Sequence, residues 1–298
     1  MLTVVFNILT PLFLIAAVGY VFGLRVKPNM QMTNRLVMDV FMPALIFHVM
    51  IQDDFNPGQT IGLVFAGVLL MLGSGLVAYL FARFVGFSWR PFVAPTMFSN
   101  WANLGLPLYV FALGEHTLGA GLMLVVAGNI LCFSLGVYIY SGKMSLAAMF
   151  KVPILIAVLL GGVVSALGLS LPEAITTPID MLGKVAIPLM LFSLGVRLTR
   201  ISRGNLKQGV LMAVFCPIVG VGLALILIQV VPLLVPLSVV HQNILILFGV
   251  LPPAVINFML AEQYDCEPEA VASMVLIANI GALVSLPLVL FFVLSSAL

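Results

Sequence analysis

Polar side chains that could bind a solute gather at two places in an otherwise apolar sequence. The first is the run Ser-Asn-Trp-Ala-Asn-Leu-Gly-Leu-Pro over residues 99–107, with Asn100, Asn103, Gly105 and Pro107. Proline lacks a backbone donor and clashes with the preceding helical turn, and glycine accepts unusual dihedral angles. We therefore expect a broken helix here, with released backbone groups beside two amide side chains.

The second place is the run Gly-Val-Leu-Pro-Pro-Ala-Val-Ile-Asn over residues 249–257. Its tandem prolines predict another helix break, and helix N-termini at such breaks present N–H donors and partial positive charge, which suit a carboxylate. The alternative is two proline kinks with asparagines that only bridge helices. On the first interpretation, the substrate-binding residues are Asn100, Asn103, Gly105, Pro107, Pro252, Pro253 and Asn257.

Further polar residues inside apolar stretches are candidates for ion coupling or for lining the site: His48, Asn129, Asn279, Asp39 and Lys184. Asp39 and Lys184 each lie four residues before a proline, so they could form a coupling pair. Each also has an oppositely charged residue four positions earlier, and local pairing of that kind near helix ends is the simpler alternative. The histidine and asparagines could equally form hydrogen bonds between helices.

The elements that must position these residues are membrane helices. Of 298 residues, 63% are hydrophobic and 7% are charged, and the mean hydropathy is +1.27. A soluble domain has about a quarter charged residues, and a membrane span needs about 20 apolar ones. We expect an all-α protein surrounded by membrane lipid, without a nucleic-acid partner. Ten predicted spans cover about residues 2–24, 35–51, 60–82, 92–113, 117–139, 152–171, 178–198, 208–231, 239–261 and 270–295.

Basic residues mark the side of the membrane on which each loop lies. Nearly all of them, including Arg25, Arg90, Lys143 and Arg197, fall in odd-numbered loops. The positive-inside rule then places those loops in the cytoplasm and both termini outside. The first stretch has no preceding basic residue and is long, so we interpret it as a retained helix in a multi-pass protein of the cell membrane.

An internal repeat relates the two halves of the chain. Pro43 and Pro107 recur 145 residues later as Pro188 and Pro252. Five spans in each half force opposite orientations, so residues 1–140 and 152–298 are predicted inverted repeats joined by a cytoplasmic linker at 141–151. Inverted repeats with matching broken helices are typical of secondary transporters with a site near the middle of the membrane.

Catalytic and metal-binding patterns are missing from the sequence. Cys132, Cys216 and Cys266 form no close pair and do not group with histidines, and no nucleophile is grouped with a base. These spacings predict neither a metal site nor a disulfide framework. We therefore expect a protein that is not an enzyme and needs no cofactor.

The segments 43–48, 100–108, 192–195 and 251–264 resemble the auxin efflux carrier family, which includes the plant PIN carriers and bacterial dicarboxylate carriers. The resemblance implies two five-helix repeats with crossed, broken fourth and ninth helices, similar to the folds of sodium/proton antiporters and bile-acid symporters. It also implies a scaffold that can form a homodimer, an elevator-type movement and a binding role for Asn100. The loop at 141–151 is short compared with long plant carriers, which makes auxin itself a doubtful substrate.

Together these features predict a secondary transporter for a small organic anion, such as malate, malonate or an auxin-like acid. The alternative is a cation/proton antiporter or sodium-coupled symporter of related fold, which ordinarily needs a carboxylate near the breaks, and neither break has one. Whether sodium or protons drive transport stays open.

Overall fold

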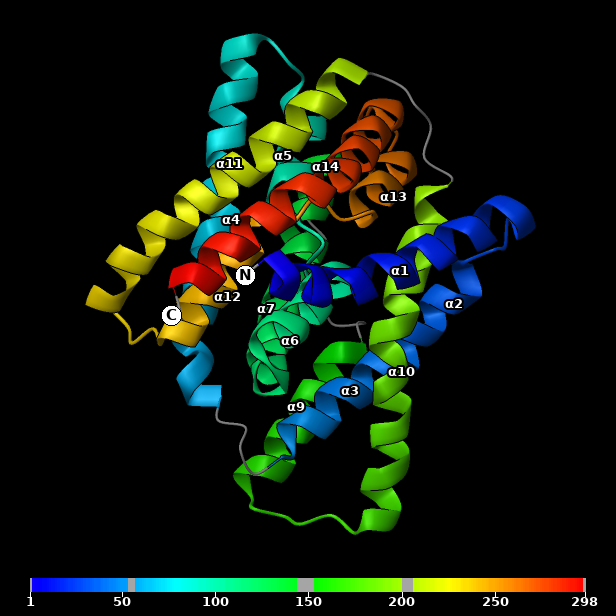
Figure 1. The fold of residues 1–298 in the computed structure, drawn as a ribbon, viewed down its shortest axis with the longest axis vertical. Coiled ribbons are helices and arrows are strands. Elements are labelled where there is room, and N and C mark those ends of the chain that lie inside the picture. The colour runs from blue at the N-terminus through cyan, green and yellow to red at the C-terminus, as the bar shows by residue number, and fades with distance from the viewer. Residues whose placement is uncertain (1, 53–56, 144–152, 200–205, 297–298) are drawn as a thin grey trace.

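The computed structural model of the chain describes residues 2–52, 57–143, 153–199 and 206–296. Every extended regular element within these ranges is a helix (Figure 1). Six helical segments are long and apolar enough to cross a membrane, which confirms an all-α, multi-pass membrane protein. They are Thr3–Val26, Gly58–Val85, Glu115–Ser141, Glu173–Leu198, Leu206–Leu233 and Pro268–Ser295.

Four shorter apolar helices occupy the other four predicted stretches: Val37–Met50, Trp101–Leu113, Ile156–Ala166 and Val239–Val250. Their shortness has a local cause in two of the stretches, where the backbone leaves the helical conformation before it has crossed about 30 Å. The total of ten spans remains a prediction, because only the six long segments reach the required length.

The helices carry the following labels and bounds, in which η1, η2 and η4 are π-helical and η3 and η6 are 3₁₀-helical. They are α1 (Leu2–Val26), α2 (Gln31–Leu36), η1 (Val37–Phe41), α3 (Met42–Met50), α4 (Pro57–Val85), α5 (Trp89–Met97), η2 (Trp101–Gly105), α6 (Leu106–Leu113), η3 (Glu115–Thr117), α7 (Leu118–Leu131), η4 (Cys132–Gly136), α8 (Val137–Ser141), α9 (Pro153–Ala166), α10 (Glu173–Leu198), α11 (Leu206–Val230), η6 (Val231–Leu233), α12 (Val239–Val250), α13 (Ile256–Gln263) and α14 (Pro268–Ser296).

The helices pack in two groups. In the first, the α10 group, α1 crosses α10 and packs on it, and α3 packs on α9 and α10 (Figure 1). In the second, the α11 group, α11 packs on α12 and α14, and α4 packs on α5, α7 and α11. We count with the α11 group residues 98–100, which follow α5, and η2, which contacts α7 and α12 as well as α10, and also η4 and α13, which contact α7 and α14 respectively; η1, which contacts α10 and α3, belongs to the α10 group. Each group contains helices from residues 1–140 and from residues 152–298. The two predicted repeats therefore interleave and do not pack as separate units, and most of the predicted linker at 141–151 lies outside the described residues.

Glycines allow the closest helix contacts within each group. A Cβ atom on Gly195 of α10 would overlap the carbonyl of Ala16 in α1, and one on Gly220 of α11 would overlap the carbonyl of Gly249 in α12. Small residues at such contacts let backbones approach and gain van der Waals packing where lipid gives no hydrophobic drive between helices. Each group is thus held together by contacts that leave no space for a side chain.

Candidate functional site

Two interruptions in the helices meet and cross. The first spans Phe98 to Asn100, between α5 and η2, and the second spans residues 251–255, between α12 and α13. The amide of Asn100 donates to the carbonyl of Pro252 at 2.8 Å, and the amide of Ala254 donates to the carbonyl of Phe98 at 3.0 Å. Unpaired backbone groups are costly inside a membrane protein, so each interruption satisfies groups that the other exposes.

The first interruption lies earlier in the chain than the sequence indicated. Pro107 is the second residue of α6, which continues directly from η2: Gly105 and Leu106 are both helical, and the Leu106 amide donates to the Trp101 carbonyl. Gly105 ends the π-helical η2, and a Cβ atom there would come within 2.9 Å of the Leu251 side chain. Both residues are buried behind the crossing and support it; neither lines the cavity described next.

Two of the predicted asparagines brace the crossing. The fully buried Asn257 donates from Nδ2 to the carbonyls of Phe98 at 2.8 Å and Ala254 at 2.9 Å. Asn279 of α14 donates to the carbonyls of Pro253 at 3.0 Å and Val275 at 2.8 Å. These contacts match the helix-bridging alternative for asparagine, so the two amides are already engaged within the protein.

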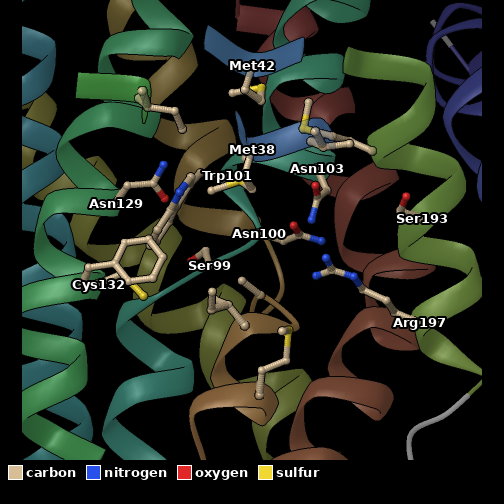
Figure 2. Close-up of a pocket in the computed structure, with 18 residues that line it drawn as sticks. Met38, Met42, Ser99, Asn100, Trp101, Asn103, Asn129, Cys132, Ser193 and Arg197 are labelled. Atoms are coloured by element: carbon tan, nitrogen blue, oxygen red, sulfur yellow. The ribbon is translucent and has the colours of Figure 1, made fainter. Parts of the chain in front are cut away.

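A cavity of about 200 Å³ lies at the crossing, on the seam between the two helix groups (Figure 2). We call it the first cavity. Of the predicted site residues, it brings together Asn100, Asn103 and Asn129, all from the α11 group. Pro252, Pro253 and Asn257 stay outside its wall. The lining consists of Val37, Met38, Met42, Ile154, Met190, Ser193 and Arg197 from the α10 group, and of Ser99, Asn100, Trp101, Ala102, Asn103, Asn129, Cys132, Phe133, Ala254, Ile256 and Met259 from the α11 group.

The polar part of this lining supplies several hydrogen-bond donors, although its asparagine and serine side chains can also accept. Four buried atoms of lining residues have no hydrogen-bond partner among the described residues: Asn100 Nδ2, Asn129 Nδ2, Ser193 Oγ and Arg197 Nε. Figure 2 shows the Arg197 guanidinium directed toward Asn100, and Asn103 lies on the far side of Asn100 from Arg197. Arginine has only donors and a permanent positive charge. The described lining includes no aspartate or glutamate. The cavity is therefore suited to accept negatively charged oxygen atoms.

Several carbonyl groups at the crossing accept hydrogen bonds within the protein. Phe98 accepts from both Ala254 and Asn257, whereas Pro252 accepts only from Asn100 and Pro253 only from Asn279 among the described residues. Hard cations are held by carbonyl and carboxylate ligands, and a carbonyl that accepts one hydrogen bond keeps a second lone pair. Among the described residues there is no cluster of histidine, cysteine and acidic side chains suited to a metal ion.

All three π-helical stretches contribute to the first cavity. Met38 comes from η1, Trp101 and Asn103 from η2, and Cys132 from η4. A π-helix carries an extra residue per turn and frequently marks a functional site. In each case the irregular turn lies at the cavity, where it determines which side chains face the interior.

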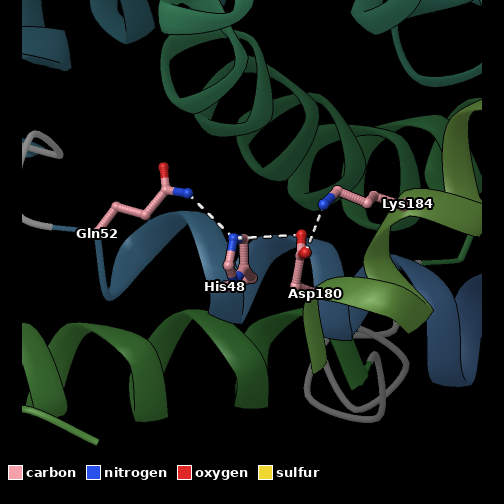
Figure 3. Close-up of polar contacts among 4 residues, drawn as sticks. All are labelled: His48, Gln52, Asp180 and Lys184. Carbon is pink, nitrogen blue, oxygen red and sulfur yellow. Dashed lines mark hydrogen bonds and ion pairs between the residues drawn. The ribbon is translucent and has the colours of Figure 1, made fainter. Parts of the chain in front are cut away.

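A second cavity, of about 760 Å³, lies on the same seam nearer the other end of α10. His48 of α3 lies 3.4 Å from Asp180 through its Nε2 atom, and Lys184 donates to the same carboxylate at 2.5 Å (Figure 3). The Gln52 side chain lies 3.0 Å from His48 Nε2. The local pairing of Lys184 with Asp180, considered from the sequence, is present. Asp39, on π-helical η1, is exposed, forms no ion pair with another described residue and lines neither cavity.

Sequence reasoning missed Arg197 and Ser193. The charge pattern assigns Arg197 to a loop, but the residue belongs to the last turn of α10 and lines the first cavity. One sequence signal could have found it: Ser193 and Arg197 lie four residues apart, so on a helix they share a face. That face also carries Met190, which adjoins the same cavity.

Comparison with known proteins gives a consistent result. A family model described as membrane transport protein matches residues 137–290, slightly more than half of the chain. An uncharacterized transporter of Methanocaldococcus jannaschii is 23% identical over 296 residues, covering 92% of this chain and 94% of that protein. An uncharacterized transporter of Methanothermobacter thermautotrophicus is 28% identical over 297 residues, covering 93% of each chain.

Proposed function

Because the chain belongs to the membrane transport protein family of auxin efflux carriers, we propose that it is a secondary transporter for a small organic anion. The observation that carries this proposal is the set of four unpartnered donor atoms around the first cavity. A buried donor without a partner costs about 1–3 kcal/mol. An anion that accepts from several of these donors at once would recover that cost on binding.

The size and lining of the cavity support a small carboxylate as cargo. Its volume of about 200 Å³ is below the range of roughly 300–1,000 Å³ typical of pockets for drug-sized ligands. Apart from the donors, the wall is mainly apolar, with Met38, Met42, Met190 and Trp101. We propose a mono- or dicarboxylate such as malate, malonate or an auxin-like acid, bound near Asn100 and Asn103.

The alternative of a cation/proton antiporter or sodium-coupled symporter receives less support. Such carriers need acidic or carbonyl oxygens to hold the cation, and the described wall of the first cavity has no acidic side chain. Asp180 faces the second cavity, where it is already paired with Lys184.

The two cavities support alternating access along the seam. Lys184 and Arg197 lie on one helix, thirteen residues apart, which corresponds to about 20 Å along the helix axis. In our proposal the α11 group carries the substrate past the α10 group, in an elevator movement, between sites near these two ends. The proposal includes ten spans in two inverted halves, a homodimer, a cytoplasmic side at the Arg197 end and both termini outside.

Transport in proteoliposomes tests the proposal. Radiolabelled malate, malonate and indole-3-acetate would be offered to vesicles under imposed sodium, proton or voltage gradients, with protein-free vesicles as control. We expect saturable uptake of at least one acid. The unlabelled acid should reduce this uptake by competition, whereas its fully methylated ester should not. Sodium or proton flux without uptake of any of the acids would favour the cation carrier instead.

A further inference from the structure

Resting on the proposed function, we infer that Arg197 and Ser193 form the charge-recognising half of the substrate site. They belong to the α10 group, whereas Asn100, Asn103 and Asn129 belong to the α11 group. A bound carboxylate would then touch both groups and bridge the seam between them. The cargo would therefore carry a carboxylate, and the charge partner of that carboxylate would be Arg197 in the α10 group, whereas the crossing belongs to the α11 group.

The geometry of α10 supports this assignment. Ser193 and Arg197 lie one helical turn apart, so both side chains face the cavity from the same side. Ser193 is 4% exposed and its Oγ atom has no partner among the described residues. Opposite them, Asn100 is 2% exposed and its Nδ2 atom is likewise unpartnered. Buried donors from two helix groups therefore converge on one space.

Charge gives a second, independent argument. Both ion pairs found among the described residues involve Asp180, and no described carboxylate pairs with Arg197. Arg197 is half-buried and its Nε atom is buried without a partner, and a buried charge is costly unless it is paired: removal of a partner from a buried pair typically costs about 3–5 kcal/mol. An arginine at this position is explained if its partner is the cargo, since a guanidinium matches a carboxylate through two parallel hydrogen bonds.

A site divided across the seam has a consequence for transport. If the α11 group moves along α10, Asn100 travels with it and Arg197 does not. The anion then loses its charge partner during the movement and is held most tightly in the arrangement seen here. Arg197 would thus both select for charge and make affinity differ between the two ends of the transport cycle.

The experiment compares ligand binding to the purified full chain and its variants. Thermal unfolding would be followed with malate, malonate, indole-3-acetate and the fully methylated ester of each acid, in which no carboxylate remains. Arg197→Gln should weaken binding of the stabilising acid at least tenfold while leaving the weak binding of its ester unchanged, and Arg197→Lys should keep part of the affinity. Arg25→Gln, which removes an exposed charge at the end of α1, is the matched control and should bind as the unaltered protein does.

The outcomes separate this inference from the proposed function. Undiminished acid binding by Arg197→Gln would overturn the role of Arg197 and leave an anion transporter. Stabilisation by a cation and by none of the acids would overturn the proposed function itself. A ligand-free measurement stands beside these: Arg197→Met should unfold at or above the temperature of the unaltered protein. A lower temperature, not shared by Arg25→Met, would make Arg197 a structural residue and refute the inference.

Discussion

The side-chain amide of Asn257 donates to the backbone carbonyl of Phe98 across 2.8 Å, from the helix that follows the second interruption to the first residue of the other interruption. The same amide donates to Ala254, and the hydroxyl of Tyr140 lies 3.5 Å from its oxygen. One buried side chain therefore holds α13, the crossing and α8 together. The sequence predicts a substrate contact for Asn257, whereas its hydrogen bonds in the structure indicate a brace.

Asn257→Ala should destabilise the fold before it affects recognition. The substitution removes hydrogen bonds to buried carbonyls, a loss of about 1–3 kcal/mol. Thermal unfolding in detergent should show a clear fall in the transition temperature. Asn103→Ala, at the half-buried wall of the first cavity, is the control and should leave that temperature nearly unchanged. Equal falls in both variants would contradict the assignment.

Gly220→Ala should separate α11 from α12. An added methyl group would overlap the carbonyl of Gly249, and backbone shifts of this kind cost about 1–3 kcal/mol or more. Gly222, two residues further on the same helix, has no atom within 4 Å of the position of an added Cβ. Gly222→Ala should therefore be tolerated. Urea or thermal unfolding of both variants measures the difference in stability between them. Loss of folded protein with Gly222→Ala would contradict the packing described.

Asn100→Asp should strongly reduce uptake of an anion. The new carboxylate has the shape of the amide but brings negative charge beside Arg197, where it would both repel the cargo and occupy its charge partner. We expect initial uptake into proteoliposomes to fall at least tenfold. Gln263→Glu adds the same charge at the exposed end of α13, away from the cavity, and should transport normally. Unaltered uptake by Asn100→Asp would count against a site at the crossing.

Cys132 provides a natural reporter of the first cavity. Its thiol belongs to the cavity wall, and the residue is only 1% exposed. In a Cys216→Ser, Cys266→Ser background, N-ethylmaleimide should modify Cys132 slowly, and a transported acid should slow the reaction further. Mass spectrometry of the intact protein measures the rate. Protection by the methyl ester equal to that by the acid would refute charge-dependent occupancy.

The Asp180 and Lys184 pair should contribute little to stability. The Lys184 side chain is 73% exposed, and solvent-exposed ion pairs contribute about 0–1 kcal/mol. Lys184→Gln should therefore leave the unfolding temperature within a degree or two. If the second cavity is the other end of the pathway, the same variant should weaken uptake from that side only. Side-selective assays with oriented vesicles would measure this difference.

Much of the fold follows from the sequence because apolar length is a strong signal in a membrane protein. All ten predicted stretches contain an apolar helix, and six of these helices have full spanning length. The positions of the interruptions were less accessible. Pro107 predicts a break near its own position, but the interruption begins at Phe98, nine residues earlier. The non-helical backbone there depends on the hydrogen bond from Asn100 to Pro252, which lies in the other half of the chain.

The site was predicted in part for a similar reason. Asn100 and Asn103 were recognisable because amides are rare in apolar stretches. Arg197 was not, because a basic residue near a helix end usually extends toward the membrane surface. Only the packing of α10 against the crossing turns that side chain inward, and this contact joins segments about a hundred residues apart.

The three π-helical turns at the first cavity bear on how this protein could acquire a different cargo. A π turn arises from a single inserted residue and is lost again by a single deletion, because the helices on either side are unchanged. Deleting one residue from η1, η2 or η4 would convert that turn to a regular α-helical turn and change which of its side chains face the cavity, while the flanking helices keep their positions. Cargo selectivity could therefore change by insertion and deletion inside a helix, without loss of the surrounding architecture.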